Sequence, residues 1–222
     1  MKPVIYITGT DTGAGKTVLT ALLAQFLRSR GLSVAAFKPV CSGGRGDALV
    51  LHAALGGALT LDEINPWHFR AAIAPSLAAR LEKKTVTLAA VLAHIRAARK
   101  KSDVTLVEGA GGLLSPLGED FNSRDLMAAL RATPVIVAPN RLGAVNHVLL
   151  TLAALPKNLR AGAKVVFVSP PKPDSATASN AKLLGEFFSA KKIFTLPWLG
   201  NKFELAEVLK LPRVRRTFQK LF

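Results

Sequence analysis

The residues best suited to chemistry lie in the segment 9–17, GTDTGAGKT, which combines glycines with a lysine and a threonine. An apolar run at 4–7 precedes it and a helix-like run follows at 18–30, the strand, loop and helix context of a phosphate-binding loop. Glycine backbone N–H groups can surround phosphate oxygens there, while Lys16 reaches the β- and γ-phosphates and the Thr17 hydroxyl ligates Mg²⁺. The loop departs from GxxxxGKT, because Thr10 stands at the first glycine position. A chance glycine turn is the alternative, and the placement of Gly-Lys-Thr at the junction disfavours it.

Three further charged residues are candidates: Glu108 and Lys38 end apolar runs, and Asp47 follows a glycine loop. Glu108 ends one run and precedes a glycine-rich stretch, so it could bind a cation or be an N-cap or a salt-bridged loop acid. Lys38 could stabilise charge on a transferring phosphoryl group or be a surface lysine. Asp47 could be a metal ligand or simply cap the helix that follows it. Asp11, inside the phosphate loop, should point away from phosphate toward a basic group or a loop amide.

The elements that must position these residues alternate along the chain. Apolar, β-branched runs at 33–40, 103–107, 134–138, 164–168 and 192–196 predict five more strands, with helices near 47–56, 87–100, 123–131, 144–155 and 177–190. This alternation predicts an α/β fold with a doubly wound, mostly parallel sheet, P-loop NTPase-like, in a single domain over residues 1–222. Ligands of such sheets bind beyond the carboxyl ends of the strands, where the polar loops gather.

Composition narrows the class of protein. The chain has 222 residues, half of them hydrophobic, and a single cysteine, Cys41, which excludes an internal disulfide. No membrane span and no signal peptide are evident, so a cytoplasmic protein without membrane partners is expected. The net charge is +16, from thirty Lys and Arg against fourteen Asp and Glu. Most of this charge lies near helix ends, except in a basic tail at about 210–222, whose apolar residues have poor helical periodicity, so that partial packing is expected.

With these residues assembled, the chain resembles the dethiobiotin synthetase family. The resemblance runs from about residue 5 to 204 and rests on six motifs: GTDTGAGKT at 9–17, KPVCSG at 38–43, NP at 65–66, VEGAGG at 107–112, LGAVNH at 142–147 and PWL at 197–199. The phosphate loop alone is shared with many ATPases, whereas the combination is specific.

The resemblance implies ATP-dependent ring closure of 7,8-diaminononanoate with CO₂, giving dethiobiotin, ADP and phosphate in biotin biosynthesis. One amine becomes a carbamate, the carbamate oxygen attacks the γ-phosphoryl group, and the second amine closes the carbamic–phosphoric anhydride. The family is a homodimer with ATP as co-substrate and Mg²⁺ as metal.

Residue roles carry over by motif. Lys16 and Lys38 would be catalytic, and Thr17, Asp47 and Glu108 would bind Mg²⁺. The substrate would meet Thr12 and Ser42, together with Leu142, Gly143 and Asn146 across the subunit boundary. The nucleotide would contact the phosphate loop and three other segments: Gly13, Ala14, Gly15, Lys16, Thr17, Val18, Asp47, Glu108, Gly109, Ala110, Gly111, Pro197, Trp198, Leu199 and Glu204.

Three departures from the family pattern stand out. Gly13 and Ala14 stand where the family often has Glu-Val. The loop from Ser42 to Asp47 is short. The dipeptide Ser-Pro at 169–170 stands where the family has an Asn-Asp that recognises adenine. The last departure predicts weak nucleotide selectivity. Two other functions remain open: a partitioning-type P-loop ATPase switch that binds DNA or membrane through a basic surface, and a related synthetase for another amine or acid. No nucleic-acid motif accompanies the charge, so nucleic acid is not the expected partner.

Overall fold

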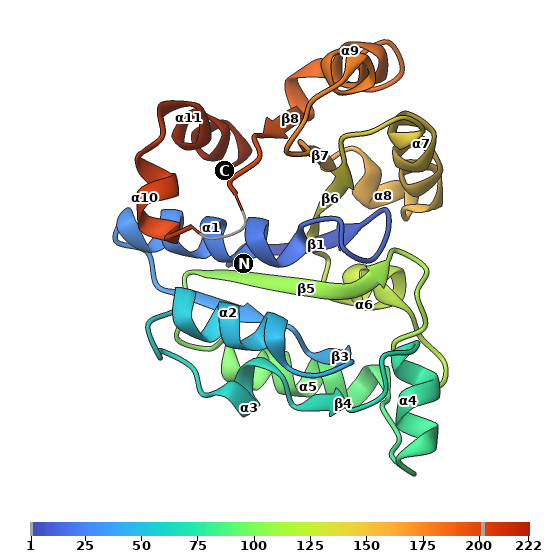
Figure 1. The fold of residues 1–222 in the computed structure, drawn as a ribbon. Helices are drawn as coiled ribbons and strands as arrows, with labels where there is room; N and C mark the ends of the chain where they lie inside the picture. The colour runs from blue at the N-terminus through green and yellow to red at the C-terminus, as the bar shows by residue number, and fades with distance from the viewer. Residues whose placement is uncertain (1, 201–202) are drawn as a thin grey trace.

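The central element is a six-stranded, wholly parallel sheet in the strand order β2-β5-β1-β6-β7-β8 (Figure 1). The computed structural model describes residues 2–200 and 203–222. The strands are β1 (Val4–Gly9), β2 (Val34–Phe37), β5 (Val104–Gly112), β6 (Thr133–Pro139), β7 (Lys164–Val168) and β8 (Ile193–Leu196). Every residue of β1 and β2 is buried, as expected for strands covered on both faces. The predicted doubly wound α/β fold is confirmed.

Helices cover the two faces of the sheet, and alternate residues of β1 point to each. Ile5 and Ile7 pack in one core with α1 (Lys16–Ser29), α2 (Gly46–Ala54), α10 (Leu205–Lys210) and α11 (Pro212–Leu221). Val4 and Tyr6 pack in the other core with α4 (Pro75–Leu81), α5 (Leu88–Ala98), α6 (Ser123–Ala129), α7 (Ala144–Ala154) and α9 (Ser175–Leu184). Shorter helices are α3 (Leu61–Ile64), α8 (Lys157–Arg160) and the 3₁₀ turn η1 (Ala190–Lys192).

The predicted second strand, 33–40, is wrong in its second half. The chain leaves the main sheet after Phe37, because Lys38 N–H donates to Ile64 O instead and Pro39 has no N–H to donate. Val40–Ser42 then forms β3, which pairs in parallel with β4 (Trp67–Phe69) in a separate two-stranded sheet. This small sheet carries Ser42 away from the main sheet edge and brings residues 70–75 beside it.

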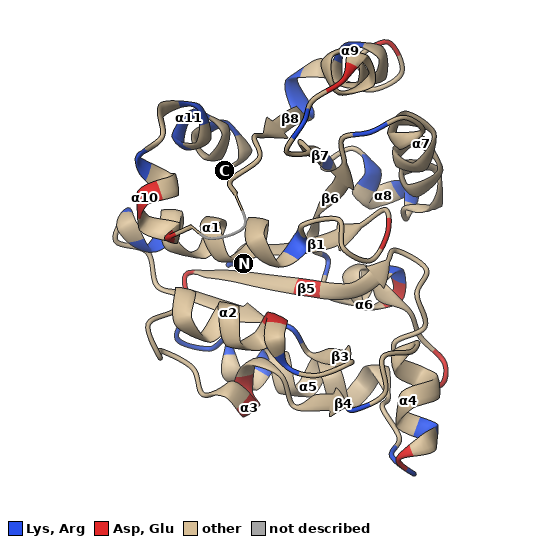
Figure 2. Cartoon of the chain, in the orientation of Figure 1, with Lys and Arg blue, Asp and Glu red and all other residues tan. Residues whose placement is uncertain are grey.

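The basic tail is more ordered than its periodicity indicated. Residues 212–221 form α11, whose Val214, Phe218 and Leu221 are buried, and Phe218 stacks on Phe26 of α1 at 5.7 Å between ring centroids. The expectation that part of this segment packs is confirmed by these three buried residues. Its three arginines and its lysine are exposed, and basic positions on α11 are blue in Figure 2. None of the helices in the described residues has the length and apolarity that crossing a membrane requires.

Candidate active site

The phosphate loop connects β1 to the N-terminus of α1. Gly15 caps α1 with φ 94°, a left-handed conformation that a Cβ would strain, and such a Cβ would also lie 3.1 Å from Val168. Within the described chain no side chain caps α1, so its first N–H groups are available to an anion. Asp11 accepts a hydrogen bond from the backbone N–H of Thr12 at 2.7 Å, which confirms that it turns to a loop amide.

Lys16 is held inside the loop that it serves. Its Nζ donates to Asp11 O at 3.0 Å, and the residue is only 6% exposed. Burial, followed by the neighbouring Lys38 cation, lowers the pKa of Lys16 to about 8. A buried ammonium close to a second cation is poorly neutralised, so an incoming phosphate would stabilise it.

Lys38, directly after β2, is the centre of a charge cluster in which Lys38 and Glu108, within β5, are buried and Asp47 is half exposed. Its Nζ lies 2.7 Å from Asp47 Oδ2 and 2.7 Å from Glu108 Oε1, and it also donates to Gly109 O at 3.2 Å. Thr17 Oγ1 donates to the same Glu108 oxygen at 2.8 Å. The structure therefore brings together all four of these predicted residues, which come from α1, the end of β2, α2 and β5.

The electrostatics follow from this pairing. Burial alone would lower the pKa of Lys38, but the charges of Glu108 and Asp47 outweigh it and hold that pKa above its ordinary value. Burial would raise the pKa of Asp47, but the charge of Lys38 and its hydrogen bond to the carboxylate outweigh burial, so the carboxyl pKa is lowered. Both groups are thus charged at neutral pH.

Close packing beneath Glu108 depends on Gly109. A Cβ at that position would lie 2.7 Å from Ser123 Oγ and 3.0 Å from the Tyr6 hydroxyl. Both hydroxyls are buried and lack a hydrogen-bond partner among the described residues. Burial raises the pKa of Tyr6, so its phenol remains neutral. The glycine at 109 is therefore needed so that the Ser123 and Tyr6 side chains can pack against the backbone, in addition to the ligand access predicted for this glycine-rich stretch.

Three oxygens of this cluster suit Mg²⁺. Glu108 Oε2 is buried and has no hydrogen-bond partner within the described residues. Asp47 contacts the Lys38 ammonium, and the Thr17 hydroxyl contacts the other oxygen of Glu108. Across the described residues no three His, Cys, Asp or Glu side chains gather. Mg²⁺ prefers one or two carboxylates with phosphates and water rather than an all-protein cage, so this donor set fits it.

A cavity of about 800 Å³ opens over the phosphate loop. Of the predicted site residues, it is lined by Thr12, Gly13, Ala14, Gly15, Lys16, Thr17, Val18, Lys38, Ser42, Asp47, Ala110 and Gly111. Residues 72–75, which precede and begin α4, complete one wall, with Cys41, Ser115 and Pro116. These lining residues were missed. Pro75 at the start of α4 is a helix-start signal that could have located this wall.

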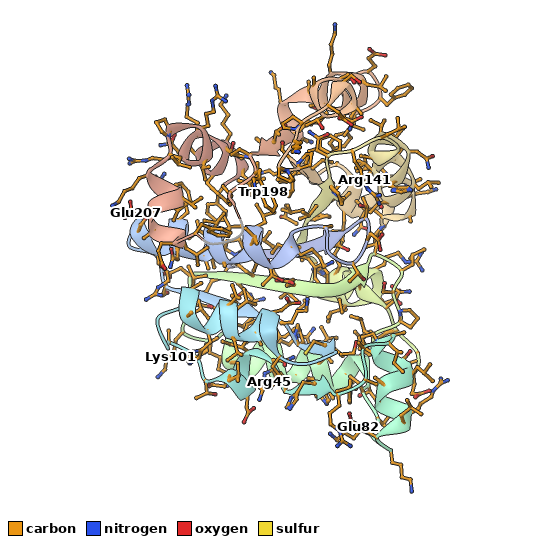
Figure 3. All side chains as sticks on the ribbon, in the orientation of Figure 1. Arg45, Glu82, Lys101, Arg141, Trp198 and Glu207 are labelled. Atoms are coloured by element: carbon orange, nitrogen blue, oxygen red, sulfur yellow. The ribbon has the colours of Figure 1, made fainter. Side chains whose placement is uncertain are left out.

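The remaining predicted residues lie outside that lining within the part of the chain described: Glu108 and Gly109, which are next to it in β5, and Leu142, Gly143, Asn146, Pro197, Trp198, Leu199 and Glu204. Leu142 is 86% exposed, and Gly143 caps α7 in the left-handed region. Trp198, labelled in Figure 3, follows β8 and is 45% exposed. The residues from Leu142 onward each lie after a strand of the main sheet, on elements other than those that form the cavity.

The fold and the site together define a P-loop nucleotide-binding protein. The family described as AAA domain matches residues 4–202. ATP-dependent dethiobiotin synthetases are similar over much of the chain: that of Bacillus subtilis (strain 168) is 35% identical, with 92% of this chain and 89% of the relative covered. That of Akkermansia muciniphila is 38% identical (83% and 87%), and that of Anaeromyxobacter sp. (strain Fw109-5) is 44% identical (68% and 70%). This chain belongs to the dethiobiotin synthetase family.

Solved structures share the fold at low identity. The pNOB8 ParA protein, described as bound to nonspecific DNA, has a TM-score of 0.61 at 14% identity, covering 100% of this chain and 97% of that one. A nucleotide-binding protein of Archaeoglobus fulgidus in complex with ADP has a TM-score of 0.52 at 16% identity, with 100% and 92% covered. At these identities the likeness concerns the fold alone.

Proposed function

We propose that this chain catalyses the ATP-dependent closure of 7,8-diaminononanoate with CO₂ to dethiobiotin, releasing ADP and phosphate. The observation that carries the proposal is the meeting, at one cavity, of the phosphate loop with Lys38 and Asp47, where Lys38 also pairs with the buried Glu108, in a chain of the dethiobiotin synthetase family. One assay tests it directly: diaminononanoate, bicarbonate, Mg²⁺ and ATP should give dethiobiotin and ADP in equal amounts. ATP hydrolysis without dethiobiotin would exclude this activity.

The proposed roles follow the geometry. The N–H groups at the start of α1 and the Lys16 ammonium bind the β- and γ-phosphates. Lys38 faces the charge that develops as the carbamate oxygen attacks the γ-phosphoryl group and forms the carbamic–phosphoric anhydride. Thr17, Asp47 and Glu108 would hold Mg²⁺, which neutralises phosphate charge. Gly109, Ala110 and Gly111 supply backbone groups beside the nucleotide.

Thr12 and Ser42 are the proposed contacts to the diamine and its carbamate. The Ser42 hydroxyl donates to Ile73 O at 2.5 Å, so its proton is committed and its lone pairs remain to accept an amine N–H. The amine that Ser42 orients then attacks the anhydride carbonyl carbon, and phosphate leaves. Residues 72–75 provide the apolar wall along which the alkyl chain of the substrate would lie.

A homodimer is the second part of the proposal, with Leu142, Gly143 and Asn146 binding the substrate carboxylate across the subunit boundary. Leu142 and Leu150 are exposed on or before α7, and the uncapped start of α7 suits an anion. We expect sedimentation under assay conditions to give twice the 23.5 kDa chain mass. A fully active monomer would contradict the cross-subunit site.

Nucleotide selectivity should be weak. Pro197, Trp198, Leu199 and Glu204 are the proposed base and ribose contacts, and 169–170 is Ser-Pro. The nearby amides are engaged elsewhere: Asn140 Nδ2 donates to Thr177 O, and Asn180 Nδ2 donates to Asn140 Oδ1 and Arg141 O. We expect kcat/KM with CTP or GTP to lie within about 100-fold of that with ATP. Only a site that hydrogen-bonds to the base edge discriminates between substrates by about 10⁴-fold in kcat/KM. A 10⁴-fold preference for ATP would show that another group reads the base.

The partitioning-switch alternative predicts DNA-dependent ATPase activity through the basic tail. A cavity of about 860 Å³ has four cations among its lining residues: Arg28, Arg30, Lys210 and Arg215. We expect only weak, salt-sensitive DNA binding by counterion release. Replacing Arg213, Arg215 and Arg216 with Gln should leave dethiobiotin formation unchanged. Loss of a DNA-stimulated ATPase in this variant, with no ring closure in the parent, would favour the switch instead.

A further inference from the structure

The turn that delivers Asp47 is not held by its own helix cap. Gly43 and Gly44 both have positive φ, of 79° and 106°, and in the described structure no side chain caps α2 at Arg45. A turn with two left-handed glycines is flexible unless other groups fix it. Yet Asp47, in the first turn of α2, lies 2.7 Å from Lys38 Nζ.

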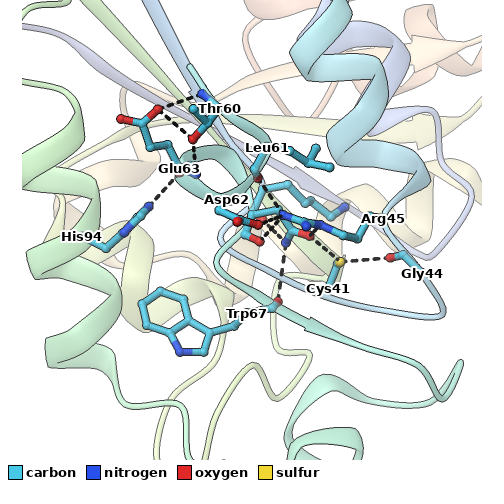
Figure 4. Close-up of polar contacts among 11 residues, drawn as sticks. Cys41, Gly44, Arg45, Thr60, Leu61, Asp62, Glu63, Trp67 and His94 are labelled. Carbon is cyan, nitrogen blue, oxygen red and sulfur yellow. Dashed lines mark hydrogen bonds and ion pairs between the residues drawn. The ribbon is translucent and has the colours of Figure 1, made fainter. Parts of the chain in front are cut away.

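Arg45 anchors this turn to the segment 61–65 (Figure 4). Its Nη2 donates to Leu61 O at 2.8 Å, to Asn65 O at 2.9 Å and to Asp62 Oδ1 at 2.8 Å, and its Nε donates to Asn65 Oδ1 at 3.3 Å. The Arg45 side chain is 21% exposed whereas that of Asp62 is 83% exposed. Because an exposed ion pair contributes little, the carbonyl and amide oxygens are the effective anchors.

Asn65 connects the same anchor to Lys38. It is completely buried, and its Nδ2 donates to Lys38 O at 2.6 Å while its Oδ1 accepts from Cys41 Sγ at 3.2 Å as well as from Arg45. Lys38 N–H donates to Ile64 O at 3.0 Å. The backbone of Lys38 and the turn before Asp47 are therefore both tied to the end of α3.

We propose that Arg45 is a positioning residue for the metal site: through Asn65 and the carbonyls of 61–65 it orients Asp47 relative to Lys38 and Thr17. This inference rests on the proposed role of Asp47 as a Mg²⁺ ligand. The loop from Ser42 to Asp47 is short, so it has few residues of its own to fix the orientation of Asp47. The planar guanidinium of Arg45 fixes the loop instead, because its donors have a rigid, forked geometry. Groups that orient metal ligands typically change metal affinity 10–100-fold when removed.

The test measures metal binding rather than turnover. Mn²⁺ is titrated into the full chain with saturating ADP, and free Mn²⁺ is followed by electron paramagnetic resonance. Arg45→Gln should weaken Mn²⁺ binding by about 10-fold or more, and Arg45→Lys by less. ADP affinity without metal should stay within about twofold, because the phosphate loop is untouched. Asp62→Asn should bind Mn²⁺ like the parent. Arg80→Gln is the matched control, since Arg80 makes three bonds to Glu119 away from the site.

The outcomes separate this inference from the proposed function. If the Asp47→Asn variant binds Mn²⁺ as tightly as the parent, Asp47 is not a metal ligand. That result would refute the proposed metal site and, with it, the positioning role of Arg45. If Asp47→Asn weakens Mn²⁺ binding but Arg45→Gln binds Mn²⁺ like the parent, only the role of Arg45 is overturned. This holds whatever the Tm of the Arg45→Gln variant. If Arg45→Gln does not fold, Arg45→Lys decides: affinity equal to the parent's would overturn the role, because an ammonium lacks the fork.

Discussion

Replacing Lys38 with methionine should lower the rate of dethiobiotin formation by about 10²–10³, the usual loss for one preorganised donor at developing charge. The side chain keeps its length and packing, so the change is mainly the removed cation. Because Lys38 Nζ is 2.7 Å from both Asp47 and Glu108, the variant also leaves two neighbouring carboxylates without their counter-ion. Product formation measured at saturating ATP and diamine checks the rate.

The same variant should be less stable without metal. Breaking a buried ion pair typically costs about 3–5 kcal/mol, which corresponds to a fall in Tm of about 6–20 °C for a chain of this size. Mg²⁺ with ADP should restore part of that loss if the carboxylates bind it. Lys210→Met, which breaks an exposed Lys–Glu pair of 2.6 Å, is the control and should change Tm little. Parent-like turnover in a folded Lys38→Met variant would remove Lys38 from the chemistry.

Most of the main sheet could be predicted because its strands are continuous apolar runs separated by helix-length segments. The second sheet could not, because β3 and β4 have three residues each and no periodicity extends over so short a run. Their pairing depends on Lys38 N–H leaving the main sheet for Ile64 O, a contact between residues far apart in sequence. The packed stripe of α11 is Val214, Phe218 and Leu221, whereas Leu211, just before the helix, is exposed.

The candidate site shows the same division. The predicted strand ends placed Lys38, Asp47 and Glu108 at one edge of the sheet. From sequence alone each could still be a surface, capping or loop residue, and only the ion pairs of Lys38 with Asp47 and Glu108 show that they form one cluster. Asp47 stands in the first turn of α2, but Arg45 is the N-cap and no side chain caps the helix within the described residues, so the capping alternative is wrong and the carboxylate contacts Lys38 instead. The link from Arg45 to Leu61 and Asn65 runs largely through backbone oxygens, which every residue type offers, so sequence carries no signal for it.

Replacing Lys16 with methionine should reduce turnover by about 10²–10³, and it should weaken ATP binding more than ADP binding. The reason is positional: a lysine at this place in a phosphate loop reaches the β- and γ-phosphates, and only ATP offers the second. Lys16 is 6% exposed, and in the ligand-free protein its Nζ donates to Asp11 O. Kinetics of product formation and calorimetric titration with each nucleotide check both expectations.

Stability distinguishes Lys16 from Lys38. Lys16 has no ion pair within the described residues, and burial next to another cation lowers its pKa to about 8, so removing its charge relieves repulsion inside the cluster. Lys16→Met should therefore keep or raise the Tm of the ligand-free protein, whereas Lys38→Met lowers it. Lys84→Met, at an exposed pair with Glu82, provides the baseline. Equal losses of Tm in the two variants would mean that Lys16 stabilises the resting fold and is not held ready for phosphate.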